Sequence, residues 1–293
     1  MKIKIIVDSS SGLSEEQAHQ LGWGFIPLQC EIENKKYQIG KDIFIGDFKI
    51  MWEANRKIHA ITSASSPVVN EQEVAKYIND YDLIMIYSIS KHLSSQISFL
   101  MNQFKDNKKV YVVDSKRISY LIVRDLLIFE EKIKQGIAFE DAIKHFEINN
   151  ERLILVPQFN DALVKGGRLS KAAAVIAKLL KIVPLIKFDF GVLEKEGIGR
   201  VFTKSLEKIV TELWNSNKDD LEDKVLFVIH AENDDLDQLI SKFKTITENG
   251  IPIYSIKLPV DVSIHTGIGA VCVTIAKIDK NIQNKLFLFA KKW

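Results

Sequence analysis

The chain has 293 residues, 46% of them hydrophobic, and its 40 basic and 38 acidic side chains leave a formal net charge of +2. This length is enough to bury a large core, and it predicts two domains or one large α/β domain. Because the two signs of charge are mixed along the chain, neither a nucleic-acid-binding stripe nor a basic membrane-binding face is expected.

Cysteine content and hydropathy indicate the compartment. The only cysteines are Cys30 and Cys272, and no C-x-x-C motif occurs. Two thiols are too few for a zinc site, and this usage favours a reduced, cytoplasmic protein. We expect no signal peptide at the start, and the most apolar segment, 172–186, is too short to span a bilayer. We therefore predict no stable membrane insertion, which leaves a transient membrane contact open, and no metal or cofactor.

The first half of the chain alternates strand-like and helix-like segments. The predicted strands cover residues 2–7, 25–32, 82–89 and 109–114. Helices are predicted after Ser14, with Gln17 completing a capping box and Gly22 as a stop, after Ser66-Pro67, over 94–104 and over 117–135. This alternation predicts a doubly wound parallel sheet of about four or five strands in a domain covering residues 1–150.

The second half, residues 151–293, has strands joined by shorter turns. A hairpin is predicted through Gly191, and strands over 224–231 and 251–259 flank a helix. This pattern predicts an α/β domain with a mixed, mostly antiparallel sheet. A helical connector over 138–150 places the domain boundary near residue 150.

Three clusters of hydroxyl side chains mark the first half: DSSSG (8–12), TSASSP (62–67) and SISKHLSS (88–95). Each alone is explained by helix capping. Together they indicate an anion site, because loops at the carboxyl ends of parallel strands line the crevice where ligands bind. The first two clusters contain no Lys or Arg, which favours a carboxylate over a polyphosphate.

Other catalytic motifs are weak or absent. GIGAVC (267–272) lacks the third glycine of a dinucleotide fingerprint, and neither a Walker A motif nor a G-x-S-x-G elbow occurs. A Ser–His–Asp hydrolase can be drawn from Ser10, His265 and Asp8, although no spacing requires it. His265 alone is more typical of a satisfied core or turn histidine than of a ligand-binding one.

The motifs in their order resemble those of the DegV family, the fatty-acid-binding subunits of the bacterial fatty acid kinase system. The resemblance covers almost the whole chain and rests on KIKIIVDSSSGL, TSASSP, LSS, YVVDSKRIS, LVKGGRLSKAAAVIAKLLKIVPLI and IHTGIGA. It implies a two-domain α/β fold that holds a long-chain fatty acid between its domains. It also implies a separate ATP-dependent fatty acid kinase subunit that phosphorylates the bound carboxyl group, with no catalysis by this chain.

The same resemblance implies the site residues. Thr62, Ser94 and His265 are expected at the carboxylate, and Ser10 and Ser63 are weaker candidates. The HTG motif adds Thr266 and Gly267. Arg168 of the GGR motif and Arg200 are expected at the face that meets the kinase.

Several positions depart from the family pattern. Ile268 stands where the family has proline, Ser95 where it has glycine, and Ala64-Ser65 where it has Gln-Pro. Two alternatives stay open: a Ser/His-dependent hydrolase or phosphotransferase, and a binder of a small molecule that is not a lipid. Phe159, Ile26 and Leu163 are candidates for the acyl tunnel, although each is more typical of ordinary core.

Overall fold

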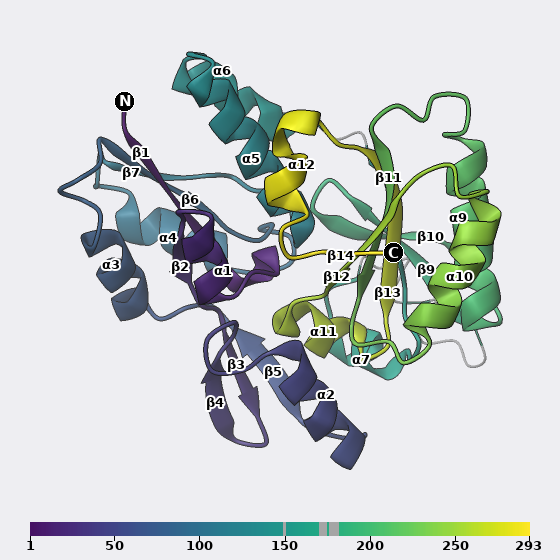
Figure 1. Ribbon diagram of the computed structural model, residues 1–293. Helices are drawn as coiled ribbons and strands as arrows, with labels where there is room; N and C mark the ends of the chain where they lie inside the picture. Colours follow the sequence, from purple (N-terminus) through teal and green to yellow (C-terminus); the bar gives the residue numbers. More distant parts are fainter. Residues whose placement is uncertain (149–150, 170–174, 176–181) are drawn as a thin grey trace. The chain divides into compact units, whose positions relative to one another are not determined.

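The structure, a computed structural model, describes residues 1–148, 151–169, 175 and 182–293 and divides into two compact units (Figure 1). The first unit contains Met1–Leu126 and Pro259–Ile264, and the second contains Leu127–Leu258 and His265–Trp293. The predicted packing segment AAAVIAKLL (172–180) lies outside the described residues apart from Val175.

The division falls inside helix α5 (Tyr120–Lys134), whereas the sequence places the boundary near residue 150. Phe129 accounts for this position, because its ring packs against Phe139 and Phe146 at centroid distances of 5.9 and 5.8 Å. The aromatic contacts therefore assign the second half of α5 to the second unit.

The first unit is built on a parallel sheet with strand order β2-β1-β6-β7. Its strands are β1 (Ile3–Asp8), β2 (Gly24–Ile26), β6 (Leu83–Tyr87) and β7 (Val110–Val112). Apolar residues from β1 and β6 pack on one face against Val74, Leu100 and Phe104. On the other face Tyr87 donates a hydrogen bond to Asp125 of α5. Helices thus cover both faces, which confirms the predicted doubly wound sheet.

The helices predicted after Ser14, after Ser66-Pro67 and over 94–104 are present in the first unit, together with a short 3-10 helix that follows β1. They are η1 (Ser9–Ser11), α1 (Glu15–Gln20), α3 (Pro67–Ala75) and α4 (Gln96–Phe104). Ser14 and Gln17 form the predicted capping box, with the two bonds at 3.1 and 3.0 Å. Gly22 has φ of +81°, a left-handed conformation that favours glycine.

A small antiparallel sheet, β4-β3-β5, accompanies helix α2 (Ile45–Ala54) in the same unit (Figure 1). Its strands are β3 (Gln29–Ile32), β4 (Lys35–Gln38) and β5 (Ala60–Ser63). The prediction of one strand over 25–32 is wrong, because Phe25 and Ile26 belong to β2 and Gln29 begins β3. Pro27 has no N–H to continue a ladder, and the N–H of Leu28 donates to Ser9 Oγ at 3.1 Å.

The second unit is built on a sheet with strand order β10-β9-β8-β13-β11-β12-β14. The strands are β8 (Leu153–Val156), β9 (Val183–Asp189), β10 (Val192–Gly199), β11 (Lys224–His230), β12 (Ile253–Lys257), β13 (Val271–Lys277) and β14 (Lys291–Lys292). Only the β11–β12 pair is parallel among the described strand pairs of this sheet. The mixed sheet and the hairpin through Gly191 are confirmed.

Helices α9 (Phe202–Asn215) and α10 (Leu236–Ile246) pack on one face of this sheet through a shared apolar core. On the other face, Phe227 and Tyr254 contact Phe287, which follows α12. The remaining helices are α6 (Phe139–Ala142), η2 (Ile143–Glu147), α7 (Asp161–Gly166), α11 (Val260–Thr266) and α12 (Lys280–Leu286). Within the described ranges, no helix has the length and apolarity needed to cross a membrane.

Candidate functional site

Asp8 ties together the loops that follow the two central strands of the parallel sheet. It ends β1, and its carboxylate accepts hydrogen bonds from the N–H of Ser10 and Ile89, each at 3.1 Å, and from the hydroxyls of Ser10 and Ser88. All of these groups are buried. Burial raises the pKa of Asp8, and the Ser10 and Ser88 hydrogen bonds oppose that rise. The DSSSG and SISKHLSS loops therefore meet, as expected for loops at the carboxyl edge of parallel strands.

Ser10 is committed to this loop contact. Its single hydroxyl proton goes to Asp8, so the hydroxyl is not the donor that a ligand carboxylate needs. The direct Ser10–Asp8 bond also differs from a hydrolase triad, in which a histidine stands between the serine and the aspartate.

Gln96 joins the TSASSP loop to the LSS loop. Its side-chain oxygen accepts from the N–H of Ser65 at 2.8 Å, and its side-chain nitrogen donates to Ser65 Oγ at 2.6 Å. The N–H of Gln96 donates to Ser94 Oγ at 3.2 Å. That bond uses a lone pair of Ser94 and not its hydroxyl proton, so Ser94 keeps donor capacity.

Thr62 and Ser63 lie at the end of β5, directly before this loop. Thr62 is half-buried, as is Ser94, whereas Ser63 is exposed. Thr62 stands opposite Cys30 in the β3–β5 ladder. The three hydroxyl clusters of the sequence are thus linked through hydrogen bonds within one unit.

The HTG and GGR motifs come together in the second unit. A Cβ placed on Gly166 would lie 3.1 Å from Nδ1 of His265, and Arg168 donates to the carbonyl of Gly166 at 2.6 Å. Burial, followed by the positive charge of Arg168, lowers the pKa of His265 to about 4. The imidazole is therefore neutral near pH 7, when it offers one N–H donor.

Thr266 is the last residue of helix α11, directly after His265, and Gly267 follows the helix. Thr266 is 3% exposed, and within the described part of the chain its hydroxyl has no hydrogen-bond partner. Gly267 and Gly269 have φ of +89° and +82°. A Cβ on Gly267 would lie 3.4 Å from the carbonyl oxygen of Phe159, whose side chain is 41% exposed. The buried hydroxyl of Thr266 and the exposed ring of Phe159 therefore belong to the segments that meet at Gly267.

The two arginines have different surroundings. Arg168 is exposed, and its positive charge acts on the buried imidazole of His265. Arg200 is exposed in the turn between β10 and α9. Of the other tunnel candidates, Ile26 and Leu163 are 0% and 3% exposed and belong to the core.

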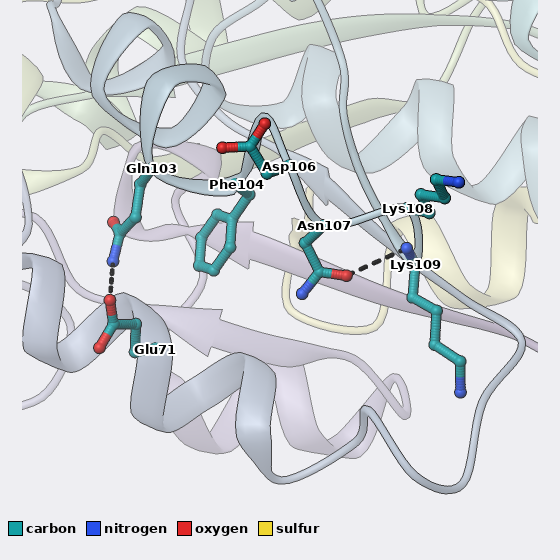
Figure 2. A pocket seen from close by; sticks show the side chains of 7 residues that line it. All are labelled: Glu71, Gln103, Phe104, Asp106, Asn107, Lys108 and Lys109. Carbon is teal, nitrogen blue, oxygen red and sulfur yellow. Dashed lines mark hydrogen bonds between the residues drawn. The ribbon is translucent and has the colours of Figure 1, made fainter.

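A surface recess of about 560 Å³ lies elsewhere on the first unit (Figure 2). Gln103 donates to Glu71 at 3.2 Å across it, and the N–H of Lys109 donates to Asn107 at 3.1 Å. The recess flanks the amino end of β7, opposite to the edge that carries the hydroxyl loops, and contains none of the predicted site residues. Its lining is mostly polar: Glu71, Gln103, Phe104, Asp106, Asn107, Lys108 and Lys109. The recess does not fit an acyl chain.

Asp261 is a buried acid that the motifs missed. It is 4% exposed, and Oδ1 has no hydrogen-bond partner among the residues described. Burial, followed by the charge of Asp8, raises its pKa to about 7. The available signal was an acid in the apolar run VDVSI, four residues before His265. Across the described ranges, no group of three or more His, Cys, Asp or Glu side chains is arranged to hold a metal ion.

Two relatives match the chain in sequence over two thirds or more of its length. A DegV domain-containing protein of Mycoplasmopsis pulmonis is 37% identical over 293 residues, covering 98% of this chain and 99% of its own. Protein DegV of Bacillus subtilis is 30% identical over 224 residues, which cover 69% of this chain and 76% of its own.

Three solved structures of fatty-acid-binding proteins have the same fold as this chain. A fatty-acid-binding DegV family protein from Thermus thermophilus has a TM-score of 0.81 at 19% identity, covering 95% of this chain and 100% of its own. DegV from Bacillus subtilis, a fatty acid binding protein, has a TM-score of 0.81 at 23% identity over 94% and 99% of the two chains. A stearic-acid-binding protein from Eubacterium ventriosum has a TM-score of 0.78 at 19% identity over 94% and 98%.

The family model described as an uncharacterised protein of the DegV family matches residues 2–277. Together with the relative from Mycoplasmopsis pulmonis, this match shows that the chain belongs to the DegV family.

Proposed function

We propose that this protein binds a long-chain fatty acid and presents its carboxyl group to a separate ATP-dependent kinase, which converts it to an acyl phosphate. The observation that carries the proposal is the shared fold. Proteins whose structures match this chain over 94–95% of its length are fatty acid binding proteins.

Side chains in each unit fit the carboxylate end of such an acid. In the first unit these are the hydroxyls of Thr62, Ser63 and Ser94. In the second unit they are neutral His265, the hydroxyl of Thr266 and the Gly267 backbone, with Arg168 beside them. A carboxylate removed from water needs such donors, because an unsatisfied buried charge is costly.

The acyl chain supplies most of the affinity in this proposal. Each buried CH₂ contributes about 0.8 kcal/mol, so a sixteen-carbon chain contributes on the order of 10 kcal/mol before entropic costs. The head-group residues then orient the acid and select a carboxylate over an ester.

The protein itself performs no catalysis in this proposal. Ser10 is bonded directly to Asp8 and is not paired with a histidine base, and no nucleotide-binding motif occurs in the sequence. The kinase supplies ATP and the phosphoryl transfer, and exposed Arg168 and Arg200 are the proposed contacts with it. Two buried thiols, Cys30 and Cys272, support a reduced, cytoplasmic setting.

Two measurements test the proposal. Mass spectrometry of an organic extract of the purified protein should detect a fatty acid. Addition of ATP and the cognate kinase should then yield an acyl phosphate, trapped by hydroxylamine as a hydroxamate. His265→Ala and Thr62→Ala should lower that yield while the protein stays folded. Failure to extract or to bind any fatty acid would overturn the proposal, and so would hydrolysis of acyl esters by the chain alone.

A further inference from the structure

Asp261 is a buried acid, and one of its two carboxyl oxygens has no hydrogen-bond partner among the described residues. Segment Pro259–Ile264, at the start of α11, packs with the first unit, and there Asp261 Oδ1 finds no hydrogen-bond partner in the described part of the chain. Two other buried titratable groups interact electrostatically with Asp261: Asp8 of β1 and Cys30 of β3. Its own helix carries one further titratable group, His265.

The hydrogen bonds decide which of the two neighbouring carboxyls carries the charge. Asp8 accepts bonds from two N–H groups and two hydroxyls, all of which favour the ionised form. Two adjacent buried carboxylates resist double ionisation. Asp261 therefore holds the proton, and its pKa of about 7 agrees with that assignment.

Position links Asp261 to the head-group candidates of the first unit. Cys30 interacts with Asp261, and Cys30 stands opposite Thr62 across the β3–β5 ladder. Residues paired in this way project to the same face of a sheet. Burial, followed by the charge of Asp261, raises the pKa of Cys30 to about 12, so this thiol stays protonated and is at most a weak donor.

We infer that the protonated carboxyl group of Asp261 donates a hydrogen bond to the carboxylate of the bound acid, alongside the hydroxyl of Thr62. This inference rests on the proposed function. A neutral carboxylic acid in an apolar site is a strong donor to an oxyanion, and once ionised it repels one. Asp261 thus makes the site selective for a carboxylate and makes that selectivity depend on pH.

The test measures palmitate affinity at pH 6 and pH 8 by displacement of a fluorescent fatty acid. For a group that titrates near pH 7, proton linkage predicts about tenfold weaker binding to the wild-type protein at pH 8. Asp261→Asn keeps an N–H donor and cannot ionise, so its affinity should stay at the wild-type pH 6 value at both pH values. Asp261→Ala should bind weakly at both.

Three controls separate the outcomes. Asp237→Asn changes an aspartate whose side chain is 85% exposed and should keep the wild-type pH dependence. Methyl palmitate, which has no carboxylate, should bind without a pH step. The melting temperatures of the variants at pH 6 should show that they fold.

A pH-independent wild-type affinity, or Asp261→Ala binding palmitate as wild type does, would overturn the inference and leave the proposed function standing. Absence of palmitate binding by the wild type at both pH values would overturn the proposed function, and the inference with it.

Discussion

The pKa values of the buried site candidates are shifted in opposite directions in the two units. The first unit surrounds Asp8 and Asp261 with hydroxyls, and burial raises the pKa of both acids. The second unit places His265 beside Arg168, and burial lowers the pKa of the imidazole to about 4. In both units burial disfavours the charged form of these side chains. The proposed head-group residues of both units are therefore neutral hydrogen-bond donors more than members of ion pairs.

The largest expected effect comes from removing the anchor of the first unit. Asp8→Ala should lower the free energy of unfolding by about 3–5 kcal/mol, because it leaves buried N–H and hydroxyl donors without their acceptor. Urea denaturation followed by circular dichroism measures this loss. Asp237→Ala, at an exposed position, should change the free energy by less than about 0.5 kcal/mol. Equal stability of the two variants would show that Asp8 does not hold the loops together.

The opposite pKa shifts predict opposite pH profiles of stability. His265, with a folded pKa of about 4 against 6.5, contributes stability that is present above pH 6.5 and lost as the pH falls toward 4. Asp261, with a folded pKa of about 7 against 3.8, contributes stability that is present below pH 3.8 and lost as the pH rises through 7.

Relative to wild type, His265→Gln should therefore gain stability at pH 4.5, and Asp261→Asn at pH 8. At about 1.4 kcal/mol per pKa unit, the gain should be on the order of 2–3 kcal/mol for His265→Gln and on the order of 4 kcal/mol for Asp261→Asn. Melting temperatures across this pH range measure both profiles. If both variants shifted the profile in the same direction, the contrast between the units would be wrong.

The smallest expected effect concerns the HTG loop. Gly267→Ala should cost about 1–2 kcal/mol, because φ of +89° is strained for any residue with a Cβ. Gly46→Ala is the matched control. Gly46 lies in helix α2 with no atom within 4 Å of an added Cβ, so alanine there should be neutral or stabilising by about 0.5–1 kcal/mol. Thermal unfolding of the two variants compares them directly, and a stable Gly267→Ala protein would show that the loop tolerates another conformation.

Local patterns predicted much of the fold. The alternation of apolar strands and capped helices indicated the parallel sheet, and the Ser14–Gln17 box and the Gly191 turn formed as expected. These features depend on neighbours in sequence, so a short segment carries the information. The strand over 25–32 was misread because Phe25-Ile26 and Gln29–Ile32 pair with partners in different sheets. The alternation of side chains with a period of two residues is the same in both strands, so it cannot show that they belong to different sheets.

The site was predictable only in part. Hydroxyl clusters at the ends of β1 and β6 indicated that these loops meet, and the Asp8–Ser88 bond confirms it. The role of Asp261 depends on its neighbour Asp8, which is 253 positions away. A single sequence does not show which distant residues interact in the folded protein. The same holds for Arg168, whose effect on the pKa of His265 follows from the fold and not from the spacing of the two residues.

Cys30 and Cys272 are native reporters, one in each unit. Both are buried, and burial raises the pKa of each to about 12, so neither reacts readily with an alkylating reagent while its surroundings stay closed. Their alkylation rates, followed by intact-mass spectrometry, would measure the rate of local opening around each cysteine. Occupancy by an acid that bridges β5 to the loops around it would then be seen as slower labelling of Cys30, with no dye or engineered label added.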